Sequence, residues 1–175
     1  MRDIANRQVA EAVTYLLWPF HILLIEIWKT RNDLDFDLDE MDRNSAYVLD
    51  LLSNSSVRAE FEYVDLRARP ANGLPLLWWE YFAKHASAAR ELMNQAAAKY
   101  SGYLDADTLV AIEDIRSDEL VYMRLPHLGE LESDNKRINP FPLTFAFGTR
   151  EGYLSLDKMI EKIRALQRAA DTAHT

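Results

Sequence analysis

The acidic segment DLDFDLDE, residues 33–40, is the first part of the chain whose spacing suggests chemistry. Its aspartates alternate with apolar residues, and alternating carboxylates open the calcium loop of helix–loop–helix proteins. Such a loop needs glycine at its sixth position for a sharp turn and glutamate at its twelfth for bidentate binding. The chain has Leu38 and Asn44 at these positions. We therefore interpret the segment as a solvated, extended connector rather than a calcium site.

Histidines are the next candidates for ligand binding. His21 lies within an apolar stretch, where a neutral imidazole needs a hydrogen-bond partner or a shifted pKa. A satisfied core histidine is the simpler interpretation of His21. The other two candidates are His85 and His127. No glutamate precedes a histidine by three residues, so the Glu-x-x-His pairs of di-iron bundles are absent, and the sequence predicts no metal ion and no cofactor.

The run WWEYF, residues 78–82, places aromatic rings on nearly every face of one helical turn. One face can enter a core, but the other must meet a second element, a ligand or another chain. We favour contact with the core and a loop, ahead of a homomeric interface and a ligand pocket. The candidate residues in this run are Trp78, Trp79 and Phe82. No phosphate loop, Gly-x-Ser-x-Gly elbow or His-Glu-x-x-His motif occurs, so we predict no catalytic residue.

Composition narrows the function classes further. The 175-residue chain has a formal net charge of −8 and an isoelectric point near 5.0, which opposes binding to phosphate backbones, so nucleic acid is not expected as a partner. It has no cysteine, which excludes disulfides, thiolate nucleophiles and Cys-ligated zinc. Asp3 and Glu11 interrupt any signal-peptide pattern. We expect a cytoplasmic protein, with membrane association only if an anchor precedes Met1.

These residues must be positioned by helices, of which the first is the most distinctive. Ala12 to Ile25 is uncharged and apolar on all sides. As a helix it spans about 21 Å, short of the ~30 Å hydrocarbon core of a bilayer. Apolar residues at steps of three and four predict a central core or interface helix over residues 3–30. Pro19 predicts a kink there, or two helices that meet near Trp18.

The remaining pattern predicts an all-α, single-domain bundle, 1–175, of about five helices. The further helices are expected over residues 41–63, with a break near 53–56, and over 76–100, 106–125 and 153–170. A turn is predicted at 69–73. Gly102 suits a left-handed helix end, and Asp105 suits the N-cap of the next helix. Residues 126–152 form one long predicted loop, draped across the first helix.

From Trp78 to Arg168 the chain carries WWEYFAKHASAARELMNQAAAKYSGYLDADTLVAIEDI and, after a variable loop, GYLSLDKMIEKIRAL. This order resembles the cytoplasmic helical region of small uncharacterised bacterial membrane proteins. The resemblance implies two long helices joined by a short turn, and it implies no chemistry. It also implies an anchor ahead of an amphipathic helix, and this chain shows no anchor.

Two functional hypotheses follow. In the first, the protein is a bacterial, non-enzymatic interaction or regulatory module that self-associates or binds a protein partner through the first helix and the aromatic run. In the second, it is a small-molecule-binding domain or an enzyme with a pocket under residues 126–152. The candidate ligand or interface residues are His21, Trp78, Trp79, Phe82, His85 and His127.

Overall fold

The computed structural model of the protein describes residues 1–31, 34–138, 144 and 152–172. All regular elements in these ranges are helical, which confirms the all-α prediction. They include eight α-helices rather than about five. The α-helices are α1 (Arg2–Thr30), α2 (Leu38–Arg43), α3 (Ser45–Ser53), α4 (Ser55–Glu62), α5 (Trp78–Tyr100), α6 (Ala106–Arg116), α7 (Leu128–Ile138) and α8 (Gly152–Thr172), and the short turns are η1 (Ser101–Tyr103), η2 (Glu119–Arg124) and η3 (Leu125–His127).

Asparagine caps explain why the second predicted helix is three helices. Asn44 and Asn54 both have extended backbones, and their side-chain oxygens accept hydrogen bonds from Ala46 N at 3.0 Å and Ser56 N at 2.9 Å. Each cap satisfies orphan amides at a helix start and stops the preceding helix. The break at residues 53–56 was predicted, whereas the separate helix α2 was not.

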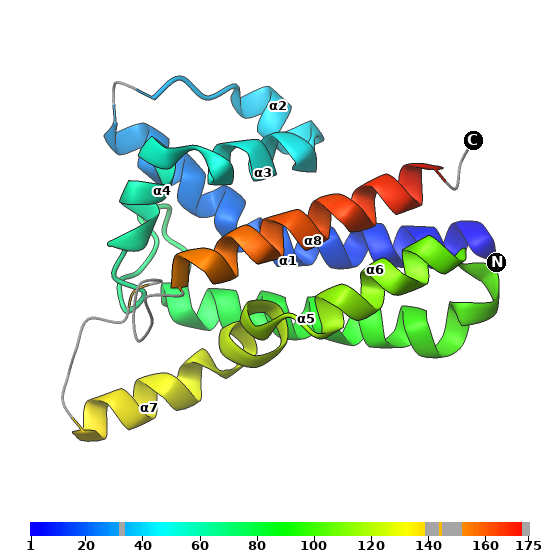
Figure 1. Cartoon of the computed structure of the whole chain (residues 1–175). Helices are drawn as coiled ribbons and strands as arrows, with labels where there is room; N and C mark the ends of the chain where they lie inside the picture. The colour runs from blue at the N-terminus through cyan, green and yellow to red at the C-terminus, as the bar shows by residue number, and fades with distance from the viewer. Residues whose placement is uncertain (32–33, 139–143, 145–151, 173–175) are drawn as a thin grey trace.

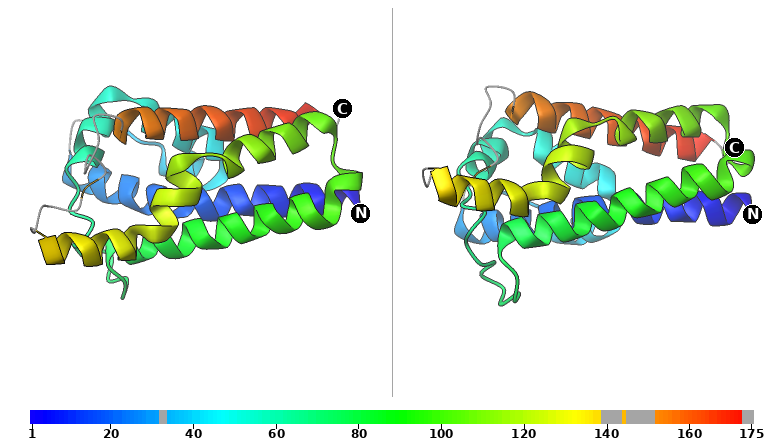
Figure 2. Two further views of the ribbon diagram at one scale, coloured as in Figure 1. Left: turned by 60° about the horizontal axis from the view of Figure 1, so that its bottom comes forward. Right: turned by 90° about the horizontal axis from the view of Figure 1, so that it is seen from below.

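Four helices run lengthwise and form the body of the molecule (Figure 1). In chain order α1, α5, α6 and α8 alternate in direction, so the N-terminus and the end of α8 lie at the same end (Figure 2). α1 packs along α5, and α6 packs along α8. The short helices α2, α3 and α4 form the excursion between α1 and α5, while η2, η3 and α7 lie between α6 and α8.

Helix α1 is the central helix, as predicted. Ten of its apolar side chains belong to the core cluster, in an i, i+3, i+4 pattern typical of a buried face. It continues without interruption through Pro19, so the prediction of two helices is wrong, and it changes direction in its second half (Figure 1). By length and composition α1 is able to cross a membrane, but 56% of its most apolar window is buried inside the fold.

The prediction of one long loop over residues 126–152 is wrong in its first part, because residues 128–138 form the helix α7. This helix packs against α5 instead of lying across α1. Arg67, from the segment before α5, holds α7 with Nε 2.8 and 2.9 Å from the two carboxylate oxygens of Glu132, which is 3% exposed. Residues 139–143 and 145–151 of the predicted loop lie outside the described residues.

Two predicted chain turns have different outcomes. Asp105 caps α6 as predicted, with Oδ1 2.8 Å from Thr108 N. Gly102 is not left-handed, because residues 101–103 continue as the 3₁₀ turn η1. Gly73 is left-handed instead, with φ of +80°, within the turn predicted at 69–73.

Candidate functional site

Two of the candidate residues, Trp78 and Phe82, lie in the core. They are 2% and 1% exposed. The Phe82 ring meets Phe20 edge to face at a centroid distance of 4.8 Å, and Phe20 stacks on Phe61 at 5.5 Å. These contacts join α1, α4 and α5. The rings therefore serve packing, in agreement with the favoured interpretation of this run.

Trp79 and His127 both contact residues at the start of α7, but they make separate interactions. A Cβ atom on Gly129 would come within 3.0 Å of the Trp79 ring, so the indole packs tightly on the start of α7. His127 Nδ1 is 3.2 Å from the carboxylate of Glu130, on the same helical turn. The sequence analysis did not use the three-residue spacing of His127 and Glu130, which places the two side chains on one helical turn.

An apolar ridge crosses the outer face of α1. We define it as Tyr15, Trp18, Ile22 and Ile25, which follow one another at steps of three and four residues. Tyr15 and Trp18 expose 38% and 40% of their surfaces, and the two isoleucines are half-buried. Large aromatic rings exposed in a row on a core helix are typical of an association surface.

His85, on α5, borders this ridge. Its ring lies 5.8 Å from the Tyr15 ring and 4.9 Å from the Tyr81 ring, between centroids. Burial lowers the pKa of His85, Lys84 lowers it further, and the backbone carbonyl of Tyr15 raises it in part. This environment favours the neutral form of the His85 imidazole, and the buried Nδ1 atom has no hydrogen-bond partner among the described residues.

His21 borders the other side of the ridge. It is 6% exposed, and its ring lies edge to face with Trp18 at 5.4 Å. Nε2 lies 3.3 Å from a carboxylate oxygen of Asp42 on α2, without hydrogen-bond geometry. Burial lowers the pKa of His21, and the Asp42 carboxylate opposes that effect. His21 therefore lies in the core with a lowered pKa, whereas its Nε2 atom has the Asp42 contact but no hydrogen-bond partner among the described residues.

A cleft of about 180 Å³ opens beside His21, between α1 and the α2–α3 segment. A second cleft of about 300 Å³ adjoins it toward α8 and shares Thr14 and Ser45 with it. The first cleft is lined by Thr14, Leu17, Trp18, His21, Met41, Asp42, Arg43, Ser45 and Val48. It combines acceptor groups with an apolar wall.

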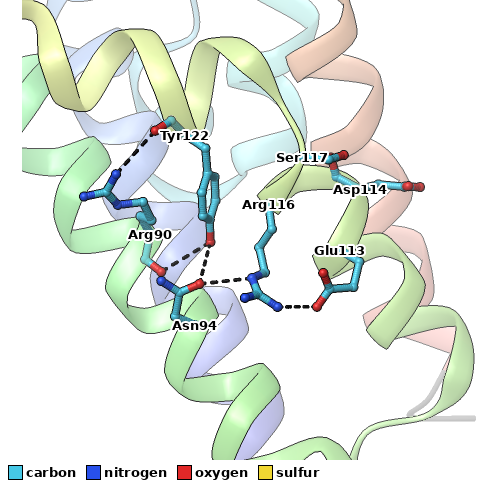
Figure 3. Close-up of polar contacts among 7 residues, drawn as sticks. All are labelled: Arg90, Asn94, Glu113, Asp114, Arg116, Ser117 and Tyr122. Carbon is cyan, nitrogen blue, oxygen red and sulfur yellow. Dashed lines mark hydrogen bonds and ion pairs between the residues drawn. The ribbon is translucent and has the colours of Figure 1, made fainter.

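A polar network connects α5 to α6 and to the π-helical turn η2 (Figure 3). Asn94 Oδ1 accepts a hydrogen bond from Arg116 Nε at 3.0 Å and one from the Tyr122 hydroxyl at 3.2 Å. Arg90 Nη1 donates to the backbone carbonyl of Tyr122 at 3.3 Å. Burial raises the pKa of Tyr122, so its phenol stays protonated and donates. The network orients η2 against α5, a packing role.

The residues that matter most at the α1 surface were missed by sequence analysis. Tyr15 and Trp18 belong to a stretch that is apolar on every side, so the sequence does not show which face of this helix stays exposed. Asp42 had no sequence signal, because a connector of unknown path separates it from His21. Of the six candidates, the structure brings together Trp78 with Phe82 in the core, and it leaves the three histidines in separate environments.

Within the described ranges, no group of three or more His, Asp or Glu side chains lies close enough to hold a metal ion. No protein-family model matches the chain, and neither the curated proteins nor the solved structures searched include a match. The feature that bears on function is therefore the exposed apolar surface of α1, with His21 and His85 at its borders.

Proposed function

We propose that this protein is a non-enzymatic interaction module that self-associates through the apolar ridge of α1. The observation that carries the proposal is the exposure of Tyr15 and Trp18, at 38% and 40%, on the central helix of the bundle. Tyrosine and tryptophan are enriched at the energetic centres of protein interfaces, since each removes a large area from water with little loss of side-chain entropy.

Charges at the ends of the ridge favour a second copy of the same chain as the partner. Glu11 continues the ridge one turn before Tyr15, and Lys29 continues it one turn after Ile25. Both are exposed, and neither forms a salt bridge with another described residue. The ridge thus carries a negative charge at one end and a positive charge at the other.

An antiparallel pairing of two α1 helices matches this pattern. If the two-fold axis passes near position 20, Trp18 faces Ile22 of the second copy and Tyr15 faces its Ile25. The same register places Glu11 opposite Lys29 twice, once on each side of the axis. An interface of two-fold symmetry requires such reciprocal contacts, in which each residue meets its partner in both directions.

Charge reversal tests this pairing by sedimentation equilibrium. Glu11→Lys alone and Lys29→Glu alone each place like charges together at both ends, so each is expected to weaken the dimer by about tenfold. A mixture of the two single variants restores both ion pairs and is expected to associate like the wild type. Lys158→Glu, an exposed charge reversal on α8, is the matched control.

Two results would contradict the proposal. One is a wild-type protein that remains monomeric at every concentration tested. The other is a dimer whose dissociation constant does not respond to either single charge reversal, which would place the interface on another surface.

A further inference from the structure

We infer that self-association through the α1 ridge weakens as the solution becomes mildly acidic, and that His85 is the residue responsible. This pH response rests on the proposed function, because it regulates the same surface. The observation that points to it is the place of His85 on α5. Its ring centroid lies 5.8 Å from that of Tyr15, a ridge residue that is 38% exposed. A histidine at the edge of an interface makes association depend on pH when only one of its protonation states tolerates being covered.

The His85 imidazole has little solvation to lose before a positive charge becomes costly. It is half-buried, it contacts the rings of Tyr15 and Tyr81, and its Nδ1 atom is buried without a hydrogen-bond partner among the described residues. Burial lowers the pKa of His85, because the imidazolium ion loses water that stabilises its charge. A second copy seated on Tyr15 removes more of this water and so disfavours the protonated form further.

The charged groups around His85 do not balance a proton on it. On α5, the exposed side chain of Lys84 lowers the pKa of His85 further. On α1, the backbone carbonyl of Tyr15 opposes this effect only in part. Glu11, one turn before Tyr15, is exposed and pairs with Lys29 of the second copy in the proposed dimer. No carboxylate among the described residues forms an ion pair with His85, in contrast to the other two candidate histidines.

His21, at the other border of the ridge, differs in this respect. Its Nε2 atom lies 3.3 Å from Oδ1 of Asp42 on α2, and this carboxylate opposes the lowering of the His21 pKa by burial. The next residue, Arg43, is exposed and therefore screened by water. A proton on His21 is balanced by the carboxylate of Asp42, whereas a proton on His85 is not balanced. We therefore assign the pH response to His85.

The direction of the response follows from proton linkage. The monomer binds a proton at His85 more readily than the dimer does, so the dimer is favoured above the monomer's pKa. That pKa lies below the ordinary value of 6.5, and the dimer weakens as the pH falls through it. Net charge acts in the opposite direction, because protonation of histidines makes the charge of −8 less negative and reduces repulsion between copies. A dimer that weakens on acidification therefore reports a local group.

Sedimentation equilibrium of the full chain between about pH 7.5 and about pH 5 measures the response, with circular dichroism at each pH to verify the fold. We expect the dissociation constant of the wild-type dimer to rise about tenfold or more over this range, and that of His85→Gln to rise less than about threefold. Lys84→Gln removes the neighbouring positive charge and should move the midpoint of the response upward by about 0.3 pH unit. His127→Gln, a substitution of a 42% exposed side chain on η3, is the matched control and should respond like the wild type.

The possible results distinguish this pH response from the proposed dimer itself. A chain that remains monomeric at every pH would overturn both. A wild-type dimer whose dissociation constant does not change with pH would overturn the pH response and leave the proposed dimer standing. A His85→Gln dimer that weakens on acidification as much as the wild type would do the same, and so would a Lys84→Gln dimer whose midpoint is unchanged or lower. The charge-reversal variants Glu11→Lys and Lys29→Glu test the dimer separately, at neutral pH.

Discussion

The backbone carbonyl of Tyr15, on α1, lies beside the imidazole of His85, on α5, and favours its protonated form. This carbonyl has lost its usual helical donor, because residue 19 is proline and has no amide hydrogen. The proline therefore frees an acceptor in the middle of the central helix, at the place where a histidine of the neighbouring helix meets it.

His85 makes the stability of the fold depend on pH. Its pKa is lowered in the folded state by burial, so between its folded value and the ordinary value of about 6.5 the unfolded chain binds more protons. The contribution of neutral His85 to stability is complete above about pH 6.5 and is lost as the pH falls toward the folded pKa. His21, whose pKa is lowered in the same direction, adds to the loss.

Urea unfolding at pH 8, 7, 6 and 5 checks this prediction. His85→Phe removes one titrating group, so its free energy of unfolding should fall less than that of the wild type over this range. Parallel pH dependence in the two proteins would show that His85 does not contribute.

Trp18→Ala should weaken self-association and leave the fold intact. The Trp18 side chain is 40% exposed and lies at the centre of the proposed contact, so its loss should raise the dissociation constant of the dimer by about tenfold or more. Tyr63→Ala, which removes a 78% exposed ring after α4, is the control and should have no effect. Analytical ultracentrifugation measures both, and equal weakening by the two substitutions would count against the ridge.

Asp105→Ala should destabilise the protein by about 1 kcal/mol at neutral pH, the usual cost of losing an N-cap. The hydrogen bond from the Thr108 backbone lowers the pKa of Asp105, so the stabilisation is present above about pH 4 and is lost as the pH falls through the lowered value. Thermal unfolding of wild type and variant at pH 7 and pH 3 measures the difference. A variant as stable as the wild type at pH 7 would contradict the capping role.

Glu132→Gln should destabilise the docking of α7. The Glu132 side chain is 4% exposed, and the substitution leaves the Arg67 guanidinium, 25% exposed, without its charge partner. Breaking a buried pair costs about 3–5 kcal/mol, and we expect about 2–3 kcal/mol here because Arg67 is partly solvated. The double variant Arg67→Met with Glu132→Leu should recover most of the loss. Equilibrium denaturation distinguishes these outcomes, and a double variant less stable than the single one would contradict this account.

The sequence by itself determined the helical class, the central position of α1, the approximate bounds of α1, α5 and α8, and the start of α6. Apolar residues at steps of three and four define a buried helical face whatever lies opposite it, and a cap such as Asp105 acts on amides only three residues away. Such signals are local, so they can be read from a short stretch of chain. Local signals did not predict the helix at residues 128–138, where Arg67 contacts Glu132 from a segment 65 residues away.

Only the tertiary structure decided which surfaces remain exposed and which side chains meet. The sequence of α1 is apolar on all sides, so nothing in it distinguishes the core residue Phe20 from the exposed Trp18. That distinction depends on where α5 and the α2–α3 segment pack. The same packing buries Trp78 and places His85 against Tyr15. It also brings Asp42 next to His21, although the sequence does not specify the path of the connector between them. Local propensities select helices, but the burial of one helix face by another is a property of the whole chain.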